Sequence, residues 1–376
     1  MRYKGTAAPP PDWTAKVDPL LQGLVRRVTL LSSATPRNAE AERARLIEAF
    51  TQDRPSNPTW QYAPRDVREA RRELGILASH LDTLGATPLR DIYLARVTEL
   101  TEEAALCEAI GKPTLAPLAE ARFLPAKNAD DARALAEEWI ASGAEEGLPV
   151  GPWVRSDDDG DPRSLLSQMR AEIGRLRLPF AVVVHPDLSS LAATGERTIL
   201  VAGNRLLSEE TTRRTVMHEV LGHALPRARA TSLSPAIFQA GTARGIDEQE
   251  GFALCIEQQR KALGPARRRE LAGRYLAVCA MREGRSFRET VLTLRKDRGL
   301  SPAEAVHVAE RCFRGSDGAF AGLGRERIYL ETFLRVRDWI EAHPDDETIL
   351  SSGQVSLDSL ATLRPFVPSR RRVTSS

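Results

Sequence analysis

The sequence predicts an α+β protein that is predominantly α-helical, with a small β-sheet beside a histidine-bearing helix. Two observations support this prediction. Most long segments repeat their apolar residues with the 3.6-residue period of a helix. Only two β-branched runs, in "LPFAVVVHPDLSS" and "ERTILVAG", have the composition of strands. Both runs precede the motif "HEVLGH", so the sheet is expected to lie next to the helix that carries this motif.

Composition sets broad limits on the class of protein. The chain has 376 residues, of which 42% are hydrophobic and 28% charged, as in a soluble globular protein. A net charge of +2 gives no reason to expect nucleic acid or a membrane as the main partner. Neither a secretory signal nor a transmembrane helix is expected. The four cysteines form no CxxC pair, so a reducing cytoplasm fits best.

The amino-terminal part is predicted to be a series of helices from about Val17 to Ile140. Asn38 is expected to cap the helix that contains "AERARLIEAF". A helical pair follows in "APRDVREARRELGILASHLDTL" and "TPLRDIYLARVTELTEEAALCEAIG", each with a proline near its start. Another helix is expected over Asp130–Ser142. The loop "GLPVGPWVRSDDDGDP", rich in Gly, Pro and Asp, then marks the main internal boundary.

The two predicted strands come next and lead into the motif helix. Ser208 is expected to cap this helix, because acidic residues fill the positions that follow it. Strand, loop, strand and histidine-bearing helix is an order that many zinc peptidases use. Beyond Gly241 the chain is predicted to be helical again up to about Ala342.

The motif contains His218, Glu219 and His223, with the two histidines five residues apart. On a regular α-helix, residues five apart point about 140° away from each other. Both histidines can bind one metal ion only if the helix is locally widened, as in a π-bulge. Gly222 is the residue expected to tolerate this distortion. The spacing therefore predicts a wide helical turn between His218 and His223.

A catalytic zinc site takes three protein ligands and keeps one position open. Glu219 follows the first histidine and is the expected general base. The third ligand is expected in "GIDEQEGFALCIEQQRKAL", where Glu248, Glu250 and Glu257 are candidates that spacing does not separate. The other histidines have no partner in sequence and are expected to be surface or capping residues: His80, His185, His307 and His343.

At "DEQEGFA" the sequence resembles the QEGLA-motif family of metallopeptidases, which includes bacterial proteins and the animal microtubule-associated tyrosine carboxypeptidases. The resemblance covers nearly the whole chain. Blocks that resemble the family occur in the same order, namely "PRNAEAERARLIEAF", "NPTWQY", "TPLRDIYLARVTELTEEAALCEAIG", "HEVLGH", "QEGFAL", "RRRELAGRYLAVCAMREGRSFRETVLTL", "RCFRGSDGAF" and "RERIYLETFLRV".

The resemblance implies a zincin-like fold of the gluzincin type and a carboxypeptidase that depends on one Zn²⁺ ion. Carried over to this sequence, the ligands are His218, His223 and Glu250, with Glu219 as general base. The resemblance thus selects Glu250 over Glu248. A ligand directly before Gly251 also leaves room for close packing between the two helices that hold the metal.

Four regions are expected along the chain. Residues 1–16 form an amino-terminal tail, and residues 17–150 form a helical lobe. Residues 151–365 form the metal-binding catalytic lobe, which is expected to make one compact unit with the first. Residues 366–376, which include "SRRRVTSS", form a disordered basic tail.

Two departures from the family pattern concern the substrate. Phe252 replaces the leucine of QEGLA, on a face that should be packed. The stretch "PRARATSLSPAIFQAGTARG" lacks Asn-Gly and Gln-Pro features of many members. This stretch is expected to shape the substrate cleft. The departures leave the metal chemistry intact and put the specificity in question.

Three further residues are expected to act on the substrate. An enzyme that removes a carboxy-terminal residue must bind a free carboxylate, and an arginine does this in bidentate fashion. Arg311 and Arg314 in "RCFRG" are the candidates, with a solvated helix end as the alternative. Tyr329 would donate a hydrogen bond to the oxyanion, with an ordinary interior tyrosine as the alternative.

The predicted function is removal of a carboxy-terminal residue, such as tyrosine or another aromatic residue, from a peptide or protein. Tubulin, a short peptide and a ribosomal precursor peptide are alternative substrates. One different function is an aminopeptidase of the dipeptidyl peptidase III type, which predicts a second, larger lobe. Another is a catalytically silent peptide-binding protein, against which the intact motif argues. The sequence gives no oligomeric state.

Overall fold

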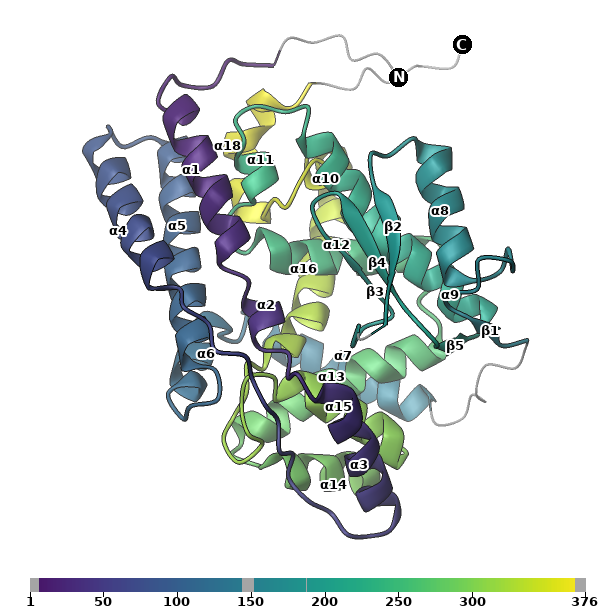
Figure 1. Ribbon diagram of the computed structural model, residues 1–376. Coiled ribbons are helices and arrows are strands. Elements are labelled where there is room, and N and C mark those ends of the chain that lie inside the picture. The colour runs from purple at the N-terminus through teal and green to yellow at the C-terminus, as the bar shows by residue number, and fades with distance from the viewer. Residues whose placement is uncertain (1–6, 144–151, 187, 369–376) are drawn as a thin grey trace.

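The computed structural model describes residues 7–143, 152–186 and 188–368. Most of these residues are helical, and the strands among them form two small sheets, as an α+β fold requires. The helices α12 (Gly245–Gln259) and α16 (Ile328–Ala342) pack against each other in the middle of the molecule. Figure 1 shows the larger sheet on one side of this pair and the amino-terminal helices α4 and α5 on the other.

The amino-terminal part is helical, as predicted. Its helices are α1 (Thr14–Arg27), α2 (Leu30–Ser33), α3 (Ala39–Thr51), α4 (Arg68–Thr83), α5 (Pro88–Ala109), α6 (Leu115–Arg122) and α7 (Ala129–Gly143). Helix α5 begins as expected for Thr87 and Pro88, because the Thr87 hydroxyl accepts a hydrogen bond from the Arg90 amide. Asn38 precedes α3, but its amide side chain bonds to the backbone of Thr59 and Gln61 instead of capping the helix.

The two predicted strands are present, and a third strand belongs to the same sheet. Strands β2 (Ala181–His185) and β4 (Thr198–Ala202) pair in parallel, and β3 (Ala192–Thr194) pairs antiparallel with β4. The order β2-β4-β3 places β3 at an edge of the sheet. A second sheet joins β1 (Val154–Arg155) to β5 (Leu206–Leu207), so the expected boundary loop contains a short strand. Residues 144–151 of that loop lie outside the described residues.

A continuous helical run follows the sheets. It consists of α9 (Glu209–Val216), the π-helix η1 (Met217–Ala224) and α10 (Leu225–Ala230). Ser208 caps the run as predicted, because its hydroxyl accepts a hydrogen bond from the Thr211 amide. Helices α8 (Leu165–Leu176) and α11 (Ile237–Ala240) lie before and after this region in sequence.

The remainder is helical beyond Gly241, as predicted. After α12 come α13 (Pro265–Arg282), α14 (Phe287–Arg298) and α15 (Pro302–Cys312), and after α16 the short helices α17 (Glu347–Leu350) and α18 (Leu360–Leu363). The 3₁₀ turns are η2 (Arg325–Arg327), η3 (Pro344–Asp346), η4 (Leu357–Ser359) and η5 (Arg364–Phe366). Capping boxes start α14 at Ser286 and α15 at Ser301.

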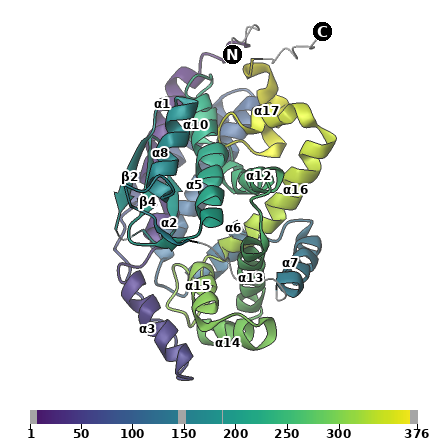
Figure 2. The same ribbon diagram turned by 90° about the vertical axis from the view of Figure 1, so that its right-hand side faces the viewer.

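Helix α12 lies between the motif helix and α16, as Figure 2 shows. Two glycines permit this close packing. A Cβ atom on Gly222 would lie 2.5 Å from the Ala253 Cβ atom, and one on Gly251 would lie 2.5 Å from the Thr332 backbone. The expectation that Gly251 makes room for the motif helix is therefore wrong. Gly251 faces α16, and Gly222 admits α12 on the other side.

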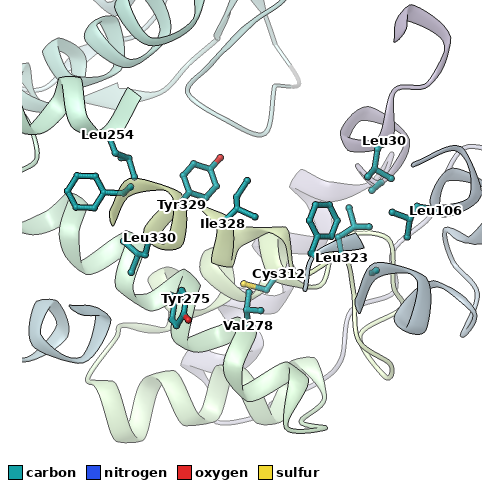
Figure 3. Packing of buried hydrophobic residues seen from close by; sticks show 14 of the residues in the cluster. Leu30, Leu106, Leu254, Tyr275, Val278, Cys312, Leu323, Ile328, Tyr329 and Leu330 are labelled. Atoms are coloured by element: carbon teal, nitrogen blue, oxygen red, sulfur yellow. The ribbon is translucent and has the colours of Figure 1, made fainter. Parts of the chain in front are cut away.

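The main hydrophobic core joins both ends of the chain. It includes Val17 of α1, Leu100 of α5, Leu254 of α12 and Phe366 of η5. Figure 3 shows part of this packing around Leu254, Tyr275 and Leu330. The predicted tails are shorter than expected, because α1 begins at Thr14 and Phe366 is buried. Residues 1–6 and 369–376 lie outside the described residues.

Candidate metal centre and active site

The predicted wide turn is present at the motif. Residues Met217–Ala224 form the π-helix η1, between the regular helices α9 and α10. A π-helix takes one more residue per turn than an α-helix, so a five-residue spacing becomes about one turn. His218 and His223 therefore project from the same side. This confirms the condition that the spacing imposes on a metal site.

Glu250 completes a three-residue cluster with the two histidines. The Nε2 atoms of His218 and His223 lie 3.2 Å apart, and the Glu250 Oε2 atom lies 3.4 Å and 3.7 Å from them. Ligand atoms about 2.1 Å from one zinc ion, at tetrahedral angles, lie about 3.4 Å apart. The residues present therefore fit one zinc ion. Among the described residues, these three form the one group of histidine, cysteine or carboxylate side chains whose atoms lie close enough together to hold a metal ion.

Both histidine rings are held by α12 on the side away from the cluster. The Nδ1 atom of His218 lies 2.7 Å from Glu257 Oε1, and that of His223 lies 2.9 Å from Gln249 Oε1. When Nδ1 donates its proton to such an acceptor, Nε2 keeps its lone pair for a metal. The sequence offered Glu257 as a ligand, but the structure makes it a partner of His218. It did not point to Gln249, although this residue belongs to the "QEG" element.

The third candidate ligand, Glu248, faces away from the histidines. Its carboxylate pairs with Arg335 of α16 and accepts a hydrogen bond of 2.5 Å from the Leu357 amide. The geometry thus selects Glu250, in agreement with the resemblance. A half-turn of helix separates the two side chains, which is why neighbouring carboxylates in one sequence element have different environments.

Glu250 is held as a carboxylate. Arg325 Nη2 lies 3.5 Å from its Oε1 atom and 3.3 Å from Asp247 Oδ1. Burial would raise the pKa of Glu250, but the hydrogen bond from His218 and the charges of His223 and Arg325 lower it well below its usual value. No pattern in the sequence pointed to Arg325, which comes from the distant turn η2.

The pKa values of the two imidazoles shift in opposite directions. Burial would lower the pKa of His218, but its hydrogen bonds to Glu250 and Glu257 raise it to about 9. Burial lowers the pKa of His223, and the neighbouring His218 acts in the same direction.

Glu219, the predicted general base, faces the edge strand β3. Its Oε2 atom accepts a hydrogen bond of 2.7 Å from the Thr194 hydroxyl. Thr194 was missed by the sequence analysis because "AAT" has no apolar alternation and no run of β-branched residues. The contact holds the carboxylate of Glu219, the residue that directly follows His218.

Tyr329 lies at the start of α16, near the cluster. Burial raises the pKa of its hydroxyl, and the charge of Glu250 adds to this effect. The guanidinium carbon of Arg325 lies 5.9 Å from the centre of its ring. In Figure 3 the hydroxyl points away from the side of the view where Cys312 and Val278 lie. Its predicted role toward an oxyanion stays a prediction.

The two predicted carboxylate-binding arginines have different surroundings. Arg311 is paired with Glu326, with Nε and Oε2 3.0 Å apart. Arg314 forms no ion pair with any residue in the described ranges, and burial lowers its pKa to about 10. Arg311 therefore already has a carboxylate partner, and Arg314 has none among the described residues.

A chain of buried ion pairs runs from the cluster toward Arg311. Glu257 contacts Arg267 at 3.3 Å, and Arg267 contacts Glu270 at 2.9 Å. Glu270 also pairs with Arg274, which reaches the partner of Arg311, Glu326, at 3.3 Å. Arg311 is thus part of the support of the metal centre.

A pocket of about 670 Å³ lies beside the metal centre and is separate from it. Asp247 lines this pocket together with residues of α5 and α16, but none of the three clustered ligands does.

A family model described as microtubule-associated tyrosine carboxypeptidase matches residues 48–370. The chain belongs to this family. The match covers the motif helix, α12 and α16, so all three clustered residues lie within it. No curated protein matches the sequence.

The family is one of peptidases, so the protein belongs to a family of enzymes. Within the described residues, no helix is both long enough and apolar enough to span a membrane.

Proposed function

We propose that the protein is a zinc-dependent carboxypeptidase. The observation that carries this proposal is the π-helical turn that brings His218 and His223 to Glu250. A regular helix would separate the histidines, so the wide turn has a clear use only if they share a ligand. Two imidazoles and one carboxylate are the ligand set of several zinc peptidases.

Each nearby side chain has a proposed task. When bound, a zinc ion supplies Lewis acidity to the scissile carbonyl and to the attacking water. Glu219 takes a proton from this water and later gives it to the leaving amine. Thr194 holds the Glu219 carboxylate in place for both transfers. Tyr329 donates a hydrogen bond to the oxygen that becomes negatively charged.

The substrate is proposed to be the carboxy-terminal end of a peptide or protein. The family description supports an end with tyrosine, and we extend this to other aromatic residues as test cases. Strand β3 supports the binding of an extended chain, since it is an edge strand beside η1. Of the two arginines that the sequence offers for the terminal carboxylate, Arg311 is paired with Glu326, and Arg314 forms no ion pair with a described residue.

The central test is the Glu219→Gln variant. Its zinc content should stay at one ion per chain, because Glu219 is not a ligand. Its kcat should fall by about 10²–10⁴-fold, because the proton acceptor is lost. The measurements are metal analysis by mass spectrometry and release of a carboxy-terminal residue from peptides.

A matched control is Glu209→Gln, an exposed carboxylate of the first turn of α9. It should keep full activity. Full activity of Glu219→Gln would contradict the mechanism.

A peptide library that varies only the last residue identifies the reaction and its specificity. Loss of single residues from the carboxyl end would support the proposal. Loss of dipeptides from the amino end would instead support the aminopeptidase alternative. Bound zinc without any trimming would support the silent binding protein. Tubulin and tail peptides that end in tyrosine belong among the substrates tested.

A further inference from the structure

Arg227 lies one helical turn after the metal ligand His223. It belongs to α10, which continues η1 without a break. Residues four apart on such a run share a face, so Arg227 projects on the side of His223. It also lies in the stretch that follows the motif and departs from the family pattern. Neither the motif nor the mechanism assigns it a task.

The guanidinium of Arg227 has no partner in the described part of the chain. Four arginines there have a buried Nε atom without a hydrogen bond, namely Arg96, Arg122, Arg227 and Arg274. The other three form ion pairs through their terminal nitrogens. Arg227 forms none with the described residues. A buried donor without an acceptor is costly, so the unpaired Nε atom of this half-buried arginine makes the side chain suited to a negatively charged ligand.

The carboxylates whose charges act on Arg227 form hydrogen bonds or ion pairs with other residues. The charges of Glu196, Glu219 and Glu250 act on it. Glu196 pairs with Arg26 at 2.9 Å, and Glu219 accepts the Thr194 hydrogen bond. Glu250 is held by the histidines and Arg325. The helix position of Arg227, one turn after His223, and the effect of these charges put it in the neighbourhood of Glu219 and Glu250, and it forms no ion pair with a described residue.

We infer that Arg227 is the residue that binds the α-carboxylate of the substrate. The inference rests on the proposed carboxypeptidase function and makes Arg227, ahead of Arg314, the residue that recognises a free chain end. A planar guanidinium offers two parallel N–H donors that match a carboxylate. Its position one turn from His223 sets the distance between the chain end and the bond that is cut.

The test compares binding of one peptide in two forms. A peptide that the wild-type enzyme trims is made with a free carboxyl end and with an amide end. Binding is measured by calorimetry to the zinc-loaded Glu219→Gln protein, which does not consume the peptide. The free form should bind at least ten times more tightly than the amide. Equal binding of both forms would contradict the carboxypeptidase proposal itself.

The same comparison is then made with a second substitution at Arg227 or Arg314. Adding Arg227→Met should bring the affinities of the two forms within a factor of two, because it removes the guanidinium that binds the carboxylate more tightly than the amide. Adding Arg227→Lys should retain part of the difference, since a lysine keeps the charge but not the fork. Adding Arg314→Met should leave the tenfold preference intact.

Retention of the tenfold preference in Arg227→Met overturns the inference, and so does its loss in Arg314→Met. Either result leaves the proposed function standing.

Thermal melting distinguishes ligand binding from a structural role. Arg227→Met should melt at the wild-type temperature or above, because it removes a buried Nε donor that has no acceptor among the described residues and nearly keeps the side-chain volume. A structural arginine would lower the melting temperature when replaced. A clear decrease in Arg227→Met therefore also overturns the inference.

Discussion

Glu257 shows how a single buried side chain supports the metal centre. Burial would raise its pKa, but Arg267 and the hydrogen bond to His218 lower it to about 2. It is therefore ionised at any physiological pH, and as a carboxylate it accepts the hydrogen bond of 2.7 Å from His218 Nδ1. Spacing in the sequence could not separate this supporting role from that of a ligand, because both require a carboxylate on the same helix.

His307 gives a prediction for stability against pH. It lies on α15, where burial lowers its pKa to about 4 despite attraction from Glu270. In the unfolded chain its pKa is about 6.5. Between pH 6.5 and pH 4, His307 binds a proton in the unfolded chain but stays neutral in the folded protein. The free energy of unfolding therefore falls as the pH decreases through this range. The expected loss from this group between pH 7 and pH 4.5 is up to about 2.5 kcal/mol.

Urea unfolding at both pH values measures this effect. His307→Gln should show a smaller decrease in stability than the wild type. His80→Gln, at an exposed position of α4, is the control and should behave as the wild type. An unchanged decrease in His307→Gln would show that other groups cause the acid sensitivity.

At the scale of elements, the metal centre depends on three helices in close contact. Helix α12 carries the ligand Glu250 and both supports of the histidines, and it touches η1 on one side and α16 on the other. Glycines stand at both contacts. The positions of the metal ligands are therefore set by how closely these helices approach.

Gly251→Ala tests this packing. The added Cβ atom would lie 2.5 Å from the Thr332 backbone, so α12 and α16 must separate. We expect a loss of about 1–3 kcal/mol in the free energy of unfolding, together with weaker zinc binding. Urea unfolding and metal titration measure the two effects.

Gly75→Ala is the matched control within a helix. Gly75 lies in α4, and a Cβ atom there would meet nothing within 4 Å. This variant should gain up to about 1 kcal/mol, because alanine favours a helix over glycine. Equal stability of Gly251→Ala and the wild type would show that the helices can move apart at little cost.

Most elements could be predicted from the sequence, but their neighbours could not. Helical periodicity located the helices, and the five-residue spacing required the wide turn of η1. Strand β3 has only three residues and no distinctive pattern, so its contact to Glu219 through Thr194 was not predictable. Gly251 was assigned to the wrong helix contact, since a sequence does not show which helix packs against which face.

At the scale of the whole molecule, one core connects the two predicted lobes. Buried residues from α1 to η5 belong to the same cluster, and it includes Leu100 as well as Leu254. A second, smaller cluster lies between the larger sheet and the motif helix, around Ile199 and Val220. The division at about residue 150 follows the sequence composition, and the packing of the core extends across it.

Unfolding is therefore expected to be a single cooperative transition. In calorimetry, the measured enthalpy should equal the van't Hoff enthalpy, both with zinc and after treatment with a chelator. The chelated protein should melt at a lower temperature, since zinc binds the folded state. Two resolved transitions would show that residues 17–150 and 151–365 unfold as separate units.

The extra residue in η1 also sets the phase of the helix that follows. In a regular helix that begins at His218, Gly222 and Pro226 would come round to the same side, four and eight positions later. The insertion shifts this phase by one residue, so His223 and Arg227 take those places. One residue therefore decides both where the second metal ligand points and which side chain follows it, and the two features cannot vary independently.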